Sequence, residues 1–368
     1  MPGLAPGARQ SLERLARDHG LPAVTVTGGS TAGFRLRARL AIRGRSNSPK
    51  LGLFEQGTHR VVTIPHCSVQ HPLINRVAGV VRRALVDAKV PIYSDKAHVG
   101  LARYLHVVVE RSSQTAQVVL VANSNAPDPG TVDSSAADSL SACLALIRER
   151  LGTELHSLWF NANLGRSNVI LGPDCVKYCG PDSVVEHFGG AAVHYPPGAF
   201  GQNNLDVAQM IVAHVREQIP AGARVAEFYA GVGAIGLSVL ARTREIRMNE
   251  MSLPSLQGLS LGLAQLDAGE REKISVFPGA AGEALEAARG AEVVIADPPR
   301  KGLDPALTLL LSEHAPERFI YVSCGLDSFV RDVAQLTSRG RLRLCALNAF
   351  DLLPFTEHAE CVGVFERR

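Results

Sequence analysis

Residues 319–331, FIYVSCGLDSFVR, indicate how the second half of the chain folds. The apolar run 319–322 predicts a buried strand, and the small residues after it let the chain turn sharply into an amphipathic helix. Cys324 stands in that turn, at the carboxyl end of the predicted strand, where open α/β sheets bind their ligands. A free cysteine is more often a small buried hydrophobic residue, so a chemical role for Cys324 depends on the motifs around it.

The alternation of strands and helices continues on both sides of this stretch. From residue 224 onwards, short apolar runs alternate with helical patterns, which is typical of a parallel, doubly wound sheet. We therefore expect an α/β, Rossmann-like domain over residues 196–368. Its first predicted helix covers residues 205–218. The predicted strands cover residues 225–229, 245–248, 274–277, 293–296, 319–322, 341–348 and 362–366.

The first third of the chain is strongly basic. Residues 1–125 hold 17 Lys and Arg against 6 Asp and Glu, a net charge of +11, whereas residues 126–368 carry −8. In residues 34–40, FRLRARL, apolar residues alternate with Arg35, Arg37 and Arg39, so a strand would place these arginines on its open face. No acid interrupts residues 33–50, which favours contact with the phosphates of a nucleic acid over the simpler alternative of a solvated strand face.

The remaining patterns of the first half predict a mixed α+β domain. We assign residues 1–195 to a basic, RNA-binding domain and residues 196–368 to the Rossmann-like domain. The elements expected in the first domain are a helix within 1–20, a hairpin over 51–64 that turns near Gly57, helices over 72–88 and 135–151, and strands over 104–110 and 116–122.

The composition is that of an ordinary globular protein, with 46% apolar and 20% charged residues among 368. No apolar run approaches the ~20 residues that span a bilayer, and the first residues lack the layout of a signal peptide. Seven cysteines without regular spacing argue against a disulfide framework. We therefore predict a reduced, cytoplasmic, monomeric protein that does not contact membranes.

Residues 227–236, EFYAGVGAIG, join a strand end to a Gly-x-Gly-x-x-Gly pattern. The glycines allow a tight turn and a close approach of the backbone to a ligand. Glu250 follows Gly231 by 19 residues, at the end of the next predicted strand, where a carboxylate would bind two ribose hydroxyls. The pattern fits a dinucleotide or S-adenosylmethionine, and the acid at Glu227 favours the second because it would repel a pyrophosphate.

Two further polar segments adjoin predicted strands. Residues 297–300, DPPR, follow an apolar run, and their two prolines make a stiff loop that holds Asp297 and Arg300 in place. Asp351, His358 and Glu360 crowd the segment before the last strand. Taken alone, this last group predicts an exposed acidic loop.

Together these motifs resemble the RNA uracil-5-methyltransferase family, whose members act on tRNA or on large-subunit rRNA. Residues 200–204 match its F-x-Q-x-N, residues 227–233 its D-x-Y-x-G-x-G with Glu227 for the Asp, and residues 297–300 its D-P-P-R. Residues 321–324 match its Y-V-S-C, and residues 350–360 its F-D-x-x-P-x-T-x-H-x-E. The chain departs from the family after Cys324, where Gly325-Leu326 replaces the usual Asn-Pro.

The resemblance implies S-adenosylmethionine as cofactor and RNA as substrate. It implies that Cys324 adds to C6 of a uracil and that Glu360 removes the C5 proton. No metal and no iron–sulfur cluster are expected, since Cys67 alone matches the cluster ligands of some relatives and Cys175 and Cys179 are spaced differently. The residues predicted to bind the cofactor are Gln202, Tyr229, Gly231, Gly233, Glu250 and Asp297. The residues predicted to bind the substrate are Phe200, Asn204, Arg300, Arg35, Arg37 and Arg39.

Three other functions stay open on the sequence. An RNA cytosine-5-methyltransferase also uses a cysteine on this strand, although it usually carries a Pro-Cys motif where this chain has residues 297–300. A nucleotide-binding oxidoreductase would explain the glycines but not Cys324 together with Glu360. An RNA-binding protein with an inactive methyltransferase pocket would explain the departure at Gly325.

Overall fold

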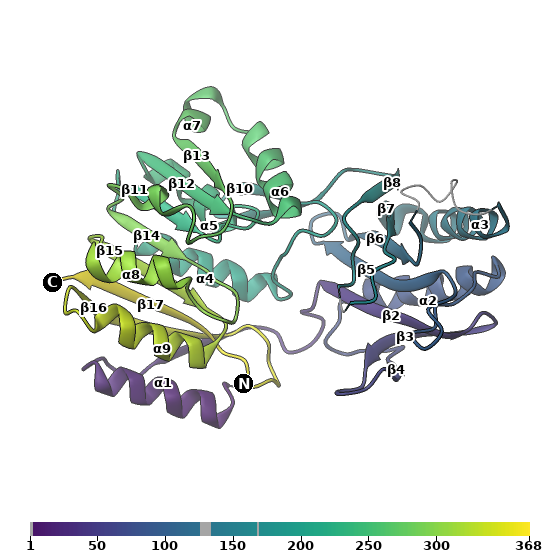
Figure 1. Cartoon of the computed structure of the whole chain (residues 1–368), viewed down its shortest axis with the longest axis horizontal. Helices are drawn as coiled ribbons and strands as arrows, with labels where there is room; N and C mark the ends of the chain where they lie inside the picture. Colours follow the sequence, from purple (N-terminus) through teal and green to yellow (C-terminus); the bar gives the residue numbers. More distant parts are fainter. Residues whose placement is uncertain (1–2, 126–133, 168) are drawn as a thin grey trace. The chain divides into compact units, whose positions relative to one another are not determined.

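The structure is a computed structural model, and it describes residues 3–125, 134–167 and 169–368 (Figure 1). The chain divides into two compact units. The Rossmann-like unit consists of residues 1–31, 187–195 and 199–368, and the basic unit consists of residues 32–186 and 196–198.

The Rossmann-like unit is built on an eight-stranded sheet in the described part of the chain, with the order β1-β16-β17-β15-β14-β11-β12-β13. Only β17 runs antiparallel to its neighbours among these described strands, and the other pairs are parallel. The predicted doubly wound architecture is thus confirmed, with one reversed strand near an edge. The strands are β1 (Thr25–Gly28), β11 (Arg224–Phe228), β12 (Glu245–Glu250), β13 (Ile274–Pro278), β14 (Val293–Ala296), β15 (Arg318–Ser323), β16 (Leu342–Asp351) and β17 (Glu360–Arg367).

Helices cover both faces of this sheet (Figure 1). Apolar side chains of α1, α8 and α9 share one core with β14, β15 and β17, while α4 and α5 pack against each other on the opposite face. Side chains cap several helix starts, as Asn204 does for α4 and Asp304 for α8. The helices are α1 (Pro6–Asp18), α4 (Leu205–Glu217), α5 (Ala234–Val239), α6 (Leu253–Ala264), α7 (Ala268–Glu272), α8 (Pro305–Glu313) and α9 (Leu326–Thr337), with short 3-10 turns at Leu240–Arg242 and Leu285–Ala288.

The beginning of the chain belongs to the Rossmann-like unit, which differs from the predicted boundary at residue 195. Strand β1 pairs in parallel with β16, in a register that joins Thr25 to Asn348. Leu12 and Leu15 of α1 are buried in the same core as Phe329 of α9. The pattern of a strand does not reveal a partner at the other end of the chain, so the sequence could not predict this arrangement.

The basic unit is a seven-stranded sheet with helices, as the α+β prediction requires. Its strand order, for the described residues, is β4-β3-β2-β5-β6-β7-β8, and every pair is antiparallel except β6 with β7, which α3 connects. Gly57 has a φ of 72° in the predicted hairpin turn between β3 and β4. The elements are β2 (Arg37–Arg45), β3 (Ser48–Phe54), β4 (Val61–Thr63), α2 (Pro72–Asp87), β5 (Ala102–Glu110), β6 (Thr115–Ala122), α3 (Ser134–Leu151), a 3-10 turn (Gly152–Glu154), β7 (Leu155–Ala162) and β8 (Cys175–Cys179).

A separate two-stranded sheet, β9 (Val184–Phe188) with β10 (Ala191–Tyr195), precedes α4. The described residues include no helix with the length and hydropathy of a membrane span.

Candidate active site

Cys324 lies directly after β15, at the predicted turn, and Gly325 separates it from the first residue of α9. The strand is buried along most of its length, with Phe319 and Tyr321 in the core shared with α9. The hydroxyl of Ser323 accepts a hydrogen bond from the backbone N–H of Gly325 at 3.3 Å, which closes the turn around the cysteine. The thiol is half-buried at the carboxyl end of a central strand.

Glu360 is the first residue of β17 and faces the same end of the sheet. Strands β15 and β17 pair in the register Ser323 to Cys361, so the next antiparallel position sets Cys324 opposite Glu360. The Glu360 side chain is buried, with 3% of the residue exposed, and its Oε1 has no hydrogen-bond partner among the described residues. The segment before the last strand is therefore not an exposed acidic loop at this position, because pairing with β15 draws Glu360 into the sheet.

Negative charge dominates the surroundings of the thiol. Burial raises the pKa of Cys324 to about 11, and the nearby carboxylates of Glu360 and Asp297 add to the rise, while Arg300 opposes it. Burial also raises the pKa of Glu360 well above its usual range, again with Asp297 adding and Arg300 opposing. The pKa of Asp297 itself is raised to about 7 by burial. The shift of Asp297 brings the pKa of its carboxyl near neutral pH, as is common in catalytic sites, whereas the raised pKa of Cys324 disfavours the thiolate at neutral pH.

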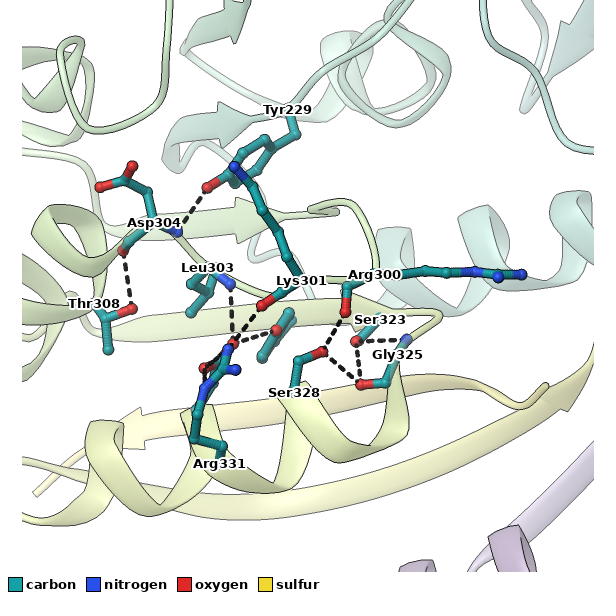
Figure 2. Close-up of polar contacts among 12 residues, drawn as sticks. Tyr229, Arg300, Lys301, Leu303, Asp304, Thr308, Ser323, Gly325, Ser328 and Arg331 are labelled. Carbon is teal, nitrogen blue, oxygen red and sulfur yellow. Dashed lines mark hydrogen bonds and ion pairs between the residues drawn. The ribbon is translucent and has the colours of Figure 1, made fainter. Parts of the chain in front are cut away.

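The loop of residues 297–304 brings Asp297 and Arg300 to this site from the end of β14. The exposed Arg300 guanidinium donates a hydrogen bond to Nε2 of His358 at 3.0 Å, so this imidazole carries its proton on Nδ1 in this arrangement. The hydroxyl of Tyr229 accepts a hydrogen bond from the backbone N–H of Asp304 at 2.9 Å, which ties the end of the loop to β11 (Figure 2).

The glycine turn after β11 has the backbone that its sequence predicts. Gly231 and Gly233 have φ values of 59° and 87°, and Tyr229 is a non-glycine residue at 60°. A Cβ on Gly236 would lie 2.2 Å from Cε of Met248, so glycine is required there for helix α5 to pack on β12. A Cβ on Gly231 would meet nothing within 4 Å, whereas one on Gly233 would lie 2.7 Å from Cδ1 of Leu259. The turn therefore leaves room for a ligand at its first glycine and packs closely at the other two.

Two acids flank this turn. The Glu250 carboxylate accepts backbone N–H groups of Gly231 at 2.7 Å, of Met251 at 2.8 Å and of Ser252 at 2.6 Å. Glu227 is buried on β11, and its Oε2 has no hydrogen-bond partner in the described part of the chain. Burial, with Asp297 adding, raises the pKa of Glu227 to about 8. The sequence did not predict that Glu250 also holds its own loop in place.

Comparison with known proteins identifies the family. Residues 188–368 match the model of the tRNA (uracil-5-)-methyltransferase family. An uncharacterised RNA methyltransferase of Protochlamydia amoebophila is 36% identical over 339 residues, which cover 92% of this chain and 87% of that protein. The chain belongs to this family of RNA methyltransferases. A second uncharacterised RNA methyltransferase, from Geobacter sulfurreducens, is 27% identical, and the match covers 91% of this chain and 66% of that protein.

The fold of the methyltransferase also matches a solved structure. The Pyrococcus abyssi tRNA (uracil-54, C5)-methyltransferase, in complex with S-adenosyl-L-homocysteine, superposes with a TM-score of 0.76 over 96% of this chain and 81% of that one. The two sequences are 23% identical. Family and fold agree with the prediction of an S-adenosylmethionine-dependent, Rossmann-like enzyme.

The three predicted binding residues that follow β10 have different environments in the methyltransferase. Phe200 is 65% exposed, and Gln202 is half-buried. Asn204 is buried, and its Oδ1 accepts a hydrogen bond from the N–H of Val207 as the cap of α4. Asn204 therefore has a structural contact that accounts for it, and its binding role stays a prediction.

Arg35, which precedes β2, and Arg37 and Arg39, which belong to it, do not all lie on an open face, which corrects the prediction. Arg39 is exposed and Arg35 is half-buried, but Arg37 is buried, with 8% exposed. His106 of β5 pairs opposite Arg39, and burial together with the charges of Arg39 and Arg37 lowers the pKa of His106 to about 3. The arginines thus form a cationic cluster that is partly enclosed rather than a solvated strand face.

Arg43 lies further along β2, within the basic stretch 33–50, but its charge is paired inside the fold. Its guanidinium binds both carboxylate oxygens of Asp95, at 2.5 and 2.8 Å, and packs against the rings of Tyr93 and Tyr104. The alternating pattern of the sequence could not show that residues 93–104 close over this position.

The two cysteines of the C-x-x-x-C spacing belong to one strand of the basic unit. Cys175 and Cys179 lie on β8, and Cys175 Sγ is 3.2 Å from Nδ2 of Asn161. Within the described ranges, no group of three or more His, Cys, Asp or Glu side chains is arranged to hold a metal ion.

Proposed function

We propose that this enzyme methylates C5 of a uridine in structured RNA through a covalent bond between Cys324 and C6. The observation that carries the proposal is the register of β15 and β17, which sets a half-buried thiol opposite a buried carboxyl whose Oε1 is free of partners among the described residues. A nucleophile and a base on neighbouring strands are what this reaction needs.

The residues around the glycine turn fit S-adenosylmethionine. The buried, unpartnered Oε2 of Glu227 and the raised pKa values of Glu227 and Asp297 describe a pocket that lacks positive charge, as judged from the described residues. Such a pocket favours a cationic ligand and repels a pyrophosphate. When bound, S-adenosylmethionine supplies a methyl group on a sulfonium centre. Gly231, Gly233 and Glu250 would hold its nucleoside, and Gln202, Tyr229 and Asp297 would complete the pocket.

The roles of Cys324 and Glu360 follow from the needs of the chemistry. The Cys324 thiolate bonds to C6 of the uracil and moves the C5–C6 electron pair onto C5 and O4 as an enolate. That pair would then form the bond from C5 to the methyl group, while the bond from the methyl group to the sulfonium sulfur would break and leave a neutral thioether. Glu360 takes the C5 proton, the electron pair of the C5–H bond becomes the new C5–C6 double bond, and the C6–S bond breaks to release the thiolate. Arg300 stands where it could stabilise the enolate.

The charges around Cys324 determine when its thiol loses the proton and becomes the nucleophile. With its pKa near 11, the thiol of the free enzyme is protonated at neutral pH. A bound cation and Arg300 both favour the thiolate, so the nucleophile forms when the pocket is loaded. The raised pKa of Glu360 makes this carboxylate a better proton acceptor than an ordinary glutamate.

The basic unit would hold the RNA by its shape and phosphates. Arg35 and Arg39 supply the charge that remains accessible on β2, and a target uridine within a folded RNA has to be flipped into the pocket. The substrate class is tRNA or rRNA. Two predictions from the sequence, a cytoplasmic location and a monomeric state, belong to the same proposal.

The test is tritium release from RNA labelled at C5. Transcripts of tRNA and of large-subunit rRNA, carrying the label on uridine or on cytidine, are incubated with the enzyme and S-adenosylmethionine. We expect release from uridine-labelled RNA of one of the two classes. Release from cytidine-labelled RNA would assign a cytosine-5-methyltransferase instead, and binding without release from any RNA would assign an RNA-binding protein with an inactive pocket.

A further inference from the structure

The loop that carries Arg300 crosses the start of α9 so closely that residue 325 has to be glycine. A Cβ built on Gly325 would lie 2.5 Å from the carbonyl oxygen of Arg300 and 2.6 Å from Oγ of Ser328. In proteins a Cβ atom essentially never lies within 3.0 Å of a heavy atom outside its own and the adjacent residues. The φ of Gly325 is −117°, which any residue adopts, so the requirement comes from space and not from backbone conformation.

Ser328 joins the loop to the turn of the nucleophile. Its buried hydroxyl lies 2.8 Å from the carbonyl oxygen of Arg300 and 2.8 Å from that of Gly325 (Figure 2). A hydroxyl has a single proton to donate, so the two carbonyls share it. Ser328 thereby links the carbonyl of Arg300 to that of Gly325, the residue that directly follows Cys324.

Asp332, one turn further along α9, holds the rest of the loop. Its buried carboxylate accepts the backbone N–H of Leu303 at 2.9 Å and the hydroxyl of Tyr321 at 2.7 Å (Figure 2). Arg331 donates to the carbonyl of Lys301 and to Asp332, at 2.8 Å each. Gly325, Ser328 and Asp332 thus lie on one face of α9 at i, i+3 and i+7, and we call these three residues the α9 clamp.

The loop matters because it carries the cation that faces the reacting groups. The charged or titratable groups that act on Cys324 are Glu360 from β17 and Asp297 and Arg300 from the loop, and Cys361 is its neighbour on β17. Of these, Arg300 alone favours the thiolate. Figure 2 shows its side chain extending away from the network, so the clamp holds the backbone of Arg300 and not its guanidinium, which contacts His358 instead.

We propose that the α9 clamp is a positioning device that fixes Arg300 relative to Cys324, with Gly325 and Ser328 as positioning residues for the nucleophile. The inference deepens the proposed function, since it gives a purpose to glycine at the position after the cysteine. It also explains why Asn cannot stand at residue 325 with the loop in this place: the carbonyl of Arg300 occupies the space of its Cβ.

The experiment measures Cys324 itself rather than methyl transfer. The full-length protein is alkylated with iodoacetamide over a range of pH, and peptide mapping follows Cys324 separately from the other cysteines. We expect Ser328→Ala to make alkylation of Cys324 about three- to tenfold slower at pH 7 and to shift its pH profile upward by up to about one unit, because the thiolate loses part of the field of Arg300. Arg300→Gln should give a shift of at least the same size.

Matched variants separate positioning from general damage. Ser312 of α8 is a buried serine whose hydroxyl also donates to a backbone carbonyl of its own helix, so Ser312→Ala should leave the profile of Cys324 unchanged. Because Ser328 acts through Arg300, Ser328→Ala should add no further shift in the Arg300→Gln background. Gly325→Ala should shift the profile more than Ser328→Ala, whereas Gly7→Ala, where a Cβ meets nothing within 4 Å, should not shift it.

The outcomes for the clamp and for the proposed function are distinct. An unchanged profile in Ser328→Ala, or an equal shift in both Arg300 backgrounds, overturns the clamp even if the enzyme methylates uridine. The expected shifts in an enzyme that releases no tritium from any RNA support the clamp and reject the proposed function.

Discussion

The methyltransferase brings like charges together in two clusters of opposite sign, one enclosed and one partly enclosed. At the carboxyl ends of β11, β14 and β17, the acids Glu227, Asp297 and Glu360 all have raised pKa values. On β2 and β5, Arg37 and Arg39 lower the pKa of His106 to about 3. In both clusters the charged form of the titrating groups, the three acids and His106, is disfavoured, because burial removes water and the nearest charges repel it.

The difference in sign teaches what each cluster is built to receive. Buried acids with raised pKa values gain most when a cation enters, because the cation favours their ionised form, and this suits the sulfonium of the proposed cofactor. A cationic cluster next to a neutral imidazole binds an anion best, which suits the phosphates of the proposed RNA. Arg43 differs from both clusters, because the carboxylate of Asp95 neutralises its charge within the fold.

The largest effect is expected at the nucleophile of the acidic cluster. Cys324→Ala removes the atom that bonds to C6, so both methyl transfer and the covalent protein–RNA complex should fall below detection. Cys345→Ala, a half-buried cysteine of β16 in the same sheet, should keep its turnover. If Cys324→Ala instead lowers the melting temperature and retains turnover in the folded fraction, Cys324 is a structural cysteine.

Replacing the base should stop the reaction after it has begun. Glu360→Gln leaves the thiolate able to add and the methyl group able to transfer, but the C5 proton stays. Turnover should fall by about 10²–10⁴-fold, and a methylated protein–RNA adduct should accumulate on denaturing gels. Glu366→Gln, at the other end of β17 and paired with Arg318, serves as the control and should accumulate none. Normal turnover without an adduct would move the role of base to His358 or Asp351.

The acidic cluster should make cofactor binding depend on pH. Glu227 and Asp297, with pKa values of about 8 and about 7, are largely protonated at pH 6 and must lose protons to attract a sulfonium. Affinity for S-adenosylmethionine should therefore rise from pH 6 to pH 8, by at most about tenfold per unit for each proton released. S-adenosylhomocysteine, whose sulfur is neutral, should depend on pH less. Calorimetry in buffers of different ionisation enthalpy measures the protons released, and equal release with both ligands would contradict the assignment.

The smallest effect is expected from single arginines of the cationic cluster. Arg35→Ala and Arg39→Ala should each reduce the slope of log affinity for RNA against log salt by about 1, which is the loss of one phosphate contact. Arg43→Ala should leave the slope unchanged, because Asp95 already neutralises that charge. Binding titrations over a range of salt give the slopes. A slope that Arg39→Ala does not alter would place the RNA elsewhere on the protein.

Much of the candidate site could be predicted because its residues stand at strand ends with local signals. Cys324, Asp297 and the turn at Gly231 and Gly233 all follow short apolar runs, and each lies where its run predicted. Ser328 and Asp332 were missed as site residues. The available signal was their spacing from Gly325, which repeats on one face of α9, but a helix face shows no contact until its partner is known.

The sequence by itself determined the order of strands and helices, the glycine turn and the position of the cysteine, since each depends on neighbours within a few residues. Only the tertiary structure decided which charges are buried. The register of β15 with β17 enclosed Glu360, and the packing around β2 enclosed Arg37 and neutralised Arg43. Long-range pairing joined β1 to β16 and brought Arg300 onto Gly325. These contacts join residues far apart in the chain, and a local pattern carries no information about such partners because many distant segments satisfy the same hydrophobic period.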